Sequence, residues 1–221
     1  MRPHLRSMIL GALAAVLAGC AAGGARAPAA SQGAGVFKPR NFRADNFIPL
    51  SVRRVVLLPV HGGALVPPEA CEYLDPIFAT ALERQARFEV VTLSREDCAK
   101  GFGAPDLSST DVLPPDFLAR LGTEYGAQAV LFVDVTAYGP YRPLTLGLRA
   151  KLATVGDRRL IWTFDEVFTC LDPAVVAGLR RYYSKGSQEG APVDLSADAL
   201  VSPRRFAAYA ADATFQTLPL R

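Results

Sequence analysis

One histidine stands where many α/β folds bind ligands. His61 follows a short apolar run and precedes two glycines, so it could belong to a phosphate cradle or an oxyanion loop. The sequence has no G-x-x-x-x-G-K-[ST] segment, no G-x-S-x-G partner and no Cys-x-x-Cys or Cys/His cluster. We therefore favour an ordinary loop residue, and we predict neither a metal nor a cofactor.

Three carboxylates could do acid–base work. Asp134, Asp165 and Glu166 fall on neighbouring predicted strands, where two of them could act as general acid and general base. Alternatively, Asp134 and one of the others point to a solvated face and pair with Arg149 or Lys151. We favour this second interpretation, so the sequence predicts no catalytic residue and no enzyme.

Tyrosines and arginines gather near one predicted turn and one predicted helix. These residue types dominate the energetics of protein interfaces. In the turn from Gly139 to Pro143, two prolines restrict the backbone and could present Tyr141 to a partner, although Tyr141 could instead fold back over the sheet edge. The predicted partner-binding residues are Tyr138, Tyr141, Arg142, Arg180, Arg181 and Tyr182.

The N-terminus resembles a bacterial lipoprotein signal. A short basic start precedes an apolar run from Met8 to Leu17, which is shorter than the ~20 residues that a membrane span needs. Leu17-Ala18-Gly19-Cys20 then resembles a lipobox. The resemblance implies cleavage before Cys20 and lipidation of its thiol and amine, and Ala21 implies sorting to the periplasmic face of the outer membrane. An ordinary signal peptide with an incidental Cys20 is the alternative.

Three cysteines follow Cys20. An oxidising periplasm favours a disulfide between two of them. Cys71 and Cys98 follow the ends of the first two predicted strands, so we predict that they pair. Cys170 is then left as a buried, inert thiol.

The chain divides into a signal peptide over residues 1–19, a lipidated Cys with a tether and an arm over residues 20–51, and one domain over residues 52–221. The tether is rich in Ala, Gly and Pro and cannot bury enough apolar surface to order itself. The arm carries three phenylalanines among charges, so it is expected to lie extended against the domain. A net charge of +3 predicts no nucleic-acid partner.

Periodicity predicts an α/β domain. Apolar runs at 55–60, 88–91 and 129–136 are typical of buried strands, and 144–152 and 159–169 of hairpin strands. Capping residues predict helices that start at Asp75-Pro76, Ser94, Pro114, Asp172-Pro173 and Ser202-Pro203. The order β-α-β-α-β-β-β-α-α predicts a mixed sheet of about five strands with helices on its faces.

From Val52 to Phe168 the chain resembles bacterial envelope lipoproteins with a TolB N-terminal-like α/β domain. The resemblance rests on the segments VVLLPV, YGAQAVLFVDVTAYGPY and DRRLIWTFDEVF. This group includes curli-secretion lipoproteins, Pel-type polysaccharide-export lipoproteins and penicillin-binding-protein activators, and it shares no catalytic residues. The resemblance therefore implies a membrane-anchored periplasmic protein that binds or scaffolds an envelope protein. The alternative is an oligomeric, ring-forming component of a secretion or polysaccharide-export system.

Overall fold

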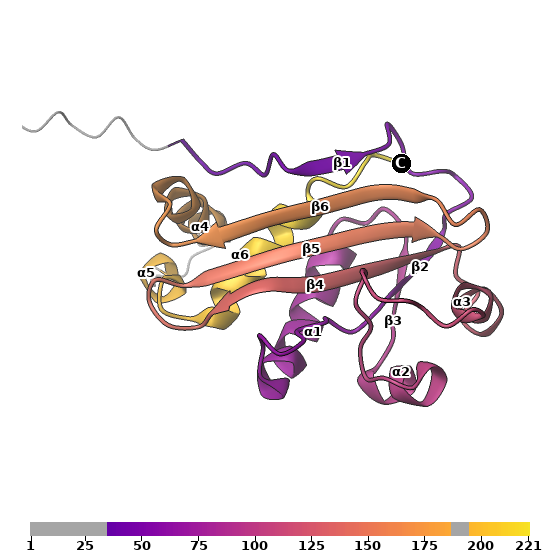
Figure 1. Cartoon of the computed structure of the whole chain (residues 1–221). Helices are drawn as coiled ribbons and strands as arrows, with labels where there is room; N and C mark the ends of the chain where they lie inside the picture. The colour runs from indigo at the N-terminus through magenta and orange to yellow at the C-terminus, as the bar shows by residue number, and fades with distance from the viewer. Residues whose placement is uncertain (1–34, 187–194) are drawn as a thin grey trace, which may run out of the picture. The chain divides into compact units, whose positions relative to one another are not determined.

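Six strands form one sheet in this computed structural model, which describes residues 35–186 and 195–221. The order across the sheet is β1-β6-β5-β4-β2-β3 (Figure 1). β2 runs parallel to β3 and β4, whereas the pairs β4–β5, β5–β6 and β1–β6 are antiparallel, as the helices and hairpins between them predict. The strands are β1 (Phe42–Ala44), β2 (Arg54–Leu57), β3 (Glu89–Thr92), β4 (Ala129–Gly139), β5 (Thr145–Thr154) and β6 (Leu160–Thr169).

The sheet has one strand more than the five or so that the sequence predicts. The additional strand is β1, a three-residue part of the N-terminal arm that pairs with β6. It is too short and too charged for its pattern to indicate a strand. The arm continues along the domain, because the Phe37 N–H donates to the Ala174 carbonyl (3.0 Å) and Ile48 is buried. The compact unit therefore starts at Gly35 and includes the arm.

Six helices lie within the described part of the chain. Three of them begin at the predicted caps, where Ser94 accepts a hydrogen bond from the Asp97 N–H, Asp172 from the Ala174 N–H and Ser202 from the Arg205 N–H. The helix predicted to start at Pro114 begins three residues later, at Phe117. None of the helices among these residues is long and apolar enough to span a bilayer. The helices are α1 (Pro68–Glu83), α2 (Arg95–Phe102), α3 (Phe117–Glu124), α4 (Pro173–Gly186), α5 (Leu195–Ala199) and α6 (Pro203–Phe215).

Helix α1 begins at Pro68, so the predicted start at Asp75-Pro76 is wrong. The Asp75 carboxylate does not cap the helix; it accepts a hydrogen bond from the Val60 N–H at 2.8 Å. Pro76 lies inside the helix. Because proline has no N–H, the Glu72 carbonyl has no donor from the residue one turn later.

Two hydrophobic cores lie on opposite faces of the sheet. Val55 and Leu57 belong to the larger core with α1, α4 and α6, whereas the alternate residues Val56 and Leu58 belong to a smaller core with α2 and α3. Figure 1 shows α1 and α6 side by side behind the sheet, where they pack against each other. The buried strand residues of the smaller core come from β2 and β4, with Val91 of β3 and Ala153 of β5 packed against them, so most of β5 and β6 keeps one polar face.

Candidate functional site

The sequence order of the sheet reverses between β2 and β4, at the position where open α/β sheets bind ligands. His61 follows β2 there and forms an isolated bridge with Asp134 of β4. Its Nδ1 atom lies 2.6 Å from Oδ1 of Asp106. The structure thus gives His61 a carboxylate partner that the sequence analysis did not assign.

Arg95 joins this pair to a second carboxylate. Its Nη1 donates to Asp106 Oδ2 (2.6 Å), its Nε to Asp75 Oδ2 (2.8 Å) and its Nη2 to the Val60 carbonyl (2.7 Å). The space beside the network is filled, because a Cβ atom on Gly62 would lie 2.7 Å from the Cys71 sulfur. Each charged side chain of the network contacts a group of opposite charge or a hydrogen-bond partner. The network therefore ties α2 to the end of β2 and has a structural role.

The three candidate carboxylates do not form an acid–base pair. Asp134 is only 4% exposed and accepts hydrogen bonds from the backbone N–H (3.0 Å) and the hydroxyl of Ser109. Our expectation that Asp134 faces solvent is therefore wrong, because the loop that carries Ser109 covers it. Asp165 pairs with Arg149 at 2.9 Å, and Glu166 accepts two backbone N–H groups of the arm.

The predicted disulfide between Cys71 and Cys98 is absent. Both thiols are free and buried, and the half-buried thiol of Cys170 is also free. Cys71 belongs to the larger core and Cys98 to the smaller one, so the sheet separates them. Burial raises the pKa of Cys98 to about 11 and also raises the pKa of Cys71.

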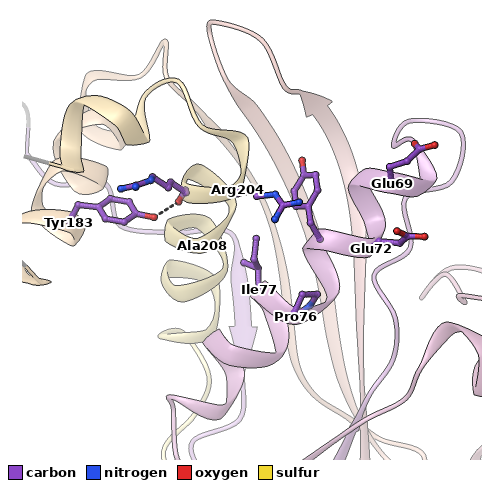
Figure 2. A pocket seen from close by; sticks show the side chains of 9 residues that line it. Glu69, Glu72, Pro76, Ile77, Tyr183, Arg204 and Ala208 are labelled. Atoms are coloured by element: carbon purple, nitrogen blue, oxygen red, sulfur yellow. Dashed lines mark hydrogen bonds between the residues drawn. The ribbon is translucent and has the colours of Figure 1, made fainter.

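A groove on the outer side of the helical layer is the best candidate for a binding site. It has a volume of about 540 Å³ and lies between α1 and α6, with α4 at one end (Figure 2). The lining residues are Glu69, Glu72, Tyr73, Pro76 and Ile77 of α1, Tyr183 of α4, and Arg204, Arg205 and Ala208 of α6.

Opposite charges line this groove without pairing with each other. Figure 2 shows Glu69 and Glu72 at one end and Tyr183 at the other, with Arg204 between them. The Arg204 guanidinium lies 4.8 Å above the Tyr73 ring, a cation–π contact that holds its position. No salt bridge joins these arginine and glutamate side chains within the described residues. The groove therefore keeps its charges available for another molecule.

Apolar surface lies between these charges, and the hollow continues along α1. Pro76, Ile77 and Ala208 line both the groove and a second hollow of about 250 Å³ that extends to Arg84. There, the Arg84 Nη1 donates to the Tyr182 hydroxyl at 2.7 Å. From Glu69 to Arg84, an α-helical rise of ~1.5 Å per residue gives a surface ~22 Å long. Such a length suits a helical or extended segment of a partner protein.

The structure does not bring all six predicted partner-binding residues to one place. Tyr138 is half-buried, with its hydroxyl 2.6 Å from that of Tyr73, and Tyr182 lines the second hollow. Tyr141 is 85% exposed, so it does not fold back over the sheet edge. Arg142 follows it in the same turn, and Arg180 and Arg181 lie exposed on α4. The predicted lipidation site, Cys20, lies outside the described residues.

None of the residues that line the groove was predicted as a site residue from the sequence, and the predicted Tyr182 lines only the second hollow. Glu69 and Glu72 lie far in the sequence from Arg204 and Arg205, and no local pattern links them. The clustered arginines after Ser202-Pro203 were the one signal that could have indicated them. Only the packing of α1 on α6 makes these residues neighbours.

No model of a known protein family matches this chain, and neither does any curated protein. Solved structures do match. The chain is similar to lipoprotein GNA1162 from Neisseria meningitidis, with 16% identity over 60% of this chain and 99% of that one, at a TM-score of 0.43. It is similar to a PelC dodecamer from Paraburkholderia phytofirmans, with 12% identity over 59% of this chain and 82% of that one, at a TM-score of 0.40. It is also similar to the C-terminal domain of LpoB from Salmonella enterica, with 22% identity over 52% of this chain and 81% of that one, at a TM-score of 0.33.

These neighbours include a protein named as a lipoprotein, a PelC and an LpoB, which agrees with the resemblance found in the sequence. All three TM-scores are below 0.5. The likeness therefore carries no residue role or partner over to this chain.

Proposed function

We propose that this chain is a lipoprotein of the bacterial envelope that binds a protein partner through the groove between α1 and α6. The observation that carries the proposal is the pair of glutamates and the pair of arginines that face one apolar floor without pairing with each other. The lipobox-like segment that ends at Cys20 supports an anchor at the periplasmic face of the outer membrane.

The groove specifies the chemistry of the partner segment. A basic side chain would face Glu69 and Glu72, and an acidic side chain would face Arg204. Between them, one or two apolar side chains would bury Ile77, which is half-buried in the free protein. The Glu72 carbonyl, which Pro76 leaves without its helical donor, offers a further acceptor.

In-cell photocrosslinking tests the proposal. A photoreactive amino acid at Ile77 is expected to link the full-length protein to one envelope protein. The charge-reversing pair Glu72→Lys with Arg204→Glu is expected to reduce that crosslink at least tenfold, because the glutamate end and the middle of the groove would both repel the partner. The matched control, Arg53→Glu with Asp111→Lys, reverses two exposed charges away from the groove and is expected to leave the crosslink unchanged.

Equal crosslinking in the groove variant and the control, at equal thermal midpoints, would reject the groove as the binding surface.

The mass of the domain in solution tests the ring-forming alternative. Size-exclusion chromatography with light scattering on residues 35–221 is expected to give a monomer, and a single large ring would instead favour an oligomeric export or secretion component.

A further inference from the structure

We propose that one end of the sheet, separate from the α1–α6 groove, rests on an anionic lipid surface. We call this region the tether-end surface, because the chain enters the compact unit there. It consists of Lys38, Tyr141, Arg142, Leu171, Arg180 and Arg181.

Backbone contacts bring the segments of the tether-end surface together. The Cys170 N–H donates to the Leu144 carbonyl at 2.9 Å, which sets the β4–β5 turn beside the start of α4. The Phe37 N–H donates to the Ala174 carbonyl at 3.0 Å, which sets the arm beside the same helix. Lys38 and Arg181 line one hollow between the arm, α4 and α6, together with Asp212 of α6. Figure 1 shows the arm, α4 and the β4–β5 turn at the same end of the sheet.

Two large side chains project from this surface into solvent. Tyr141 is 85% exposed and Leu171 is 73% exposed. A proline on either side of the Tyr141-Arg142 pair limits the backbone entropy that binding would cost. A tyrosine with an apolar ring and a polar hydroxyl suits the boundary between lipid and water.

The charges of the tether-end surface favour an anionic partner. Lys38, Arg142, Arg180 and Arg181 take part in no salt bridge within the described residues. The two carboxylates nearest in sequence accept backbone N–H groups, Asp172 from Ala174 and Glu166 from the arm. Basic side chains around exposed apolar ones are the combination that peripheral proteins use on anionic bilayers.

The position of the tether favours lipid over other anionic partners. If Cys20 is lipidated, the ~15 residues from Cys20 to Gly35 span at most ~50 Å. The membrane is therefore always within reach of this end, and the high local concentration makes even a weak lipid contact effective. This step rests on the proposed lipid anchor, whereas the contacts and charges of the surface do not.

Vesicle binding tests the inference without the anchor. Both cores consist of residues after Gly35, so the segment 35–221 is a self-contained folding unit. It is expected to co-sediment with vesicles of phosphatidylglycerol and phosphatidylcholine and to detach from them as salt is raised. Binding to vesicles of phosphatidylcholine alone is expected to be much weaker.

Two matched triple variants locate the contact. Arg142→Gln, Arg180→Gln and Arg181→Gln together are expected to lower the partition coefficient roughly a hundredfold, at about fivefold per cation. The control triple variant removes the same charge from exposed cations at the other end of the sheet: Arg53→Gln, Arg158→Gln and Arg221→Gln. It is expected to change the partition coefficient little. Tyr141→Ser with Leu171→Ser is expected to reduce the binding that persists at high salt.

Equal losses in the two triple variants would overturn the inference, because binding would then follow net charge alone. Absence of binding to the anionic vesicles would overturn it as well. A photoreactive residue at position 141 that links to a protein instead of to lipid in cells would show that this end is a protein interface. None of these results bears on the crosslink at Ile77, so the proposed groove is tested separately.

Discussion

The Tyr209 hydroxyl lies directly against Gly178, where α6 packs on α4. A Cβ atom at position 178 would overlap this oxygen, so only glycine allows the contact. The hydroxyl is fully buried and has no hydrogen-bond partner within the described residues. This contact combines a close helix approach with an unsatisfied polar atom, and it sets the distance between the two helices behind the sheet.

Substitutions at this contact are expected to be strongly non-additive. Gly178→Ala gains up to ~1 kcal/mol in helix propensity but loses ~1–3 kcal/mol by overpacking, so it should lower the free energy of unfolding. Tyr209→Phe removes a buried, unpaired hydroxyl and should raise the free energy of unfolding by ~1 kcal/mol. In the double variant, Gly178→Ala should cost less than it does alone. Urea unfolding of the four proteins gives the coupling, and strict additivity would contradict the contact.

Stability is expected to fall at alkaline pH. Burial raises the pKa of Tyr209 to about 12, whereas an unfolded tyrosine titrates near ~10. The folded state holds this proton more tightly, so the stabilisation is fully present below pH ~10 and is lost as pH rises towards 12. Tyr209 alone should account for ~3 kcal/mol of the loss. Unfolding of Tyr209→Phe between pH 8 and 12 should show a smaller slope, and an equal slope would exclude Tyr209 as the cause.

The charge network at the end of β2 is expected to stabilise the fold. Arg95→Met leaves Asp75 and Asp106 without their shared cation and should lower the free energy of unfolding by ~2–3 kcal/mol. Arg95→Lys should restore only part of this, because an ammonium cannot reproduce the planar guanidinium contacts. The exposed Arg53→Met is the control and should change stability by less than ~0.5 kcal/mol. If Arg95→Met behaves like this control, the network does not hold the fold.

The buried thiols are expected to be unreactive in the folded protein. Cys98 is fully buried and Cys71 is 5% exposed, and burial raises the pKa of both, so little thiolate forms at neutral pH. With a thiol reagent, the half-buried Cys170 should react first, and the other two only on unfolding. Mass mapping of non-reduced peptides gives an independent check. A peptide linked through Cys71 and Cys98 would contradict the free thiols.

Membrane attachment is expected to depend on Cys20. Cys20→Ser removes the thiol that the lipobox resemblance implies is acylated, and the protein should then be recovered uncleaved or in the soluble fraction. Membrane fractionation after a high-salt wash measures this. A processed Cys20→Ser protein that still pellets with the membrane would rule out the lipid anchor.

Much of the sheet was predictable because its signals are local. The run from Ala129 to Thr136 indicates a buried strand by composition, and the alternation from Leu144 to Leu152 indicates one wet face. Serine caps such as Ser94 are also local, since their hydrogen bonds reach only three residues along the chain. Strand directions then follow from the lengths of the connections.

The features that the sequence did not reveal depend on distant partners. Strand β1 exists only because β6 offers it a free edge, and Asp75 fails to cap a helix because Val60 and Arg95 bind its carboxylate instead. Periodicity carries no information about such pairs. Residue types alone could indicate that arginine and tyrosine form recognition surfaces. Only the packing of α1 on α6 sets Arg204 over Tyr73 and opposite Glu72, because long-range contacts, not spacing along the chain, determine which surface charges share a groove.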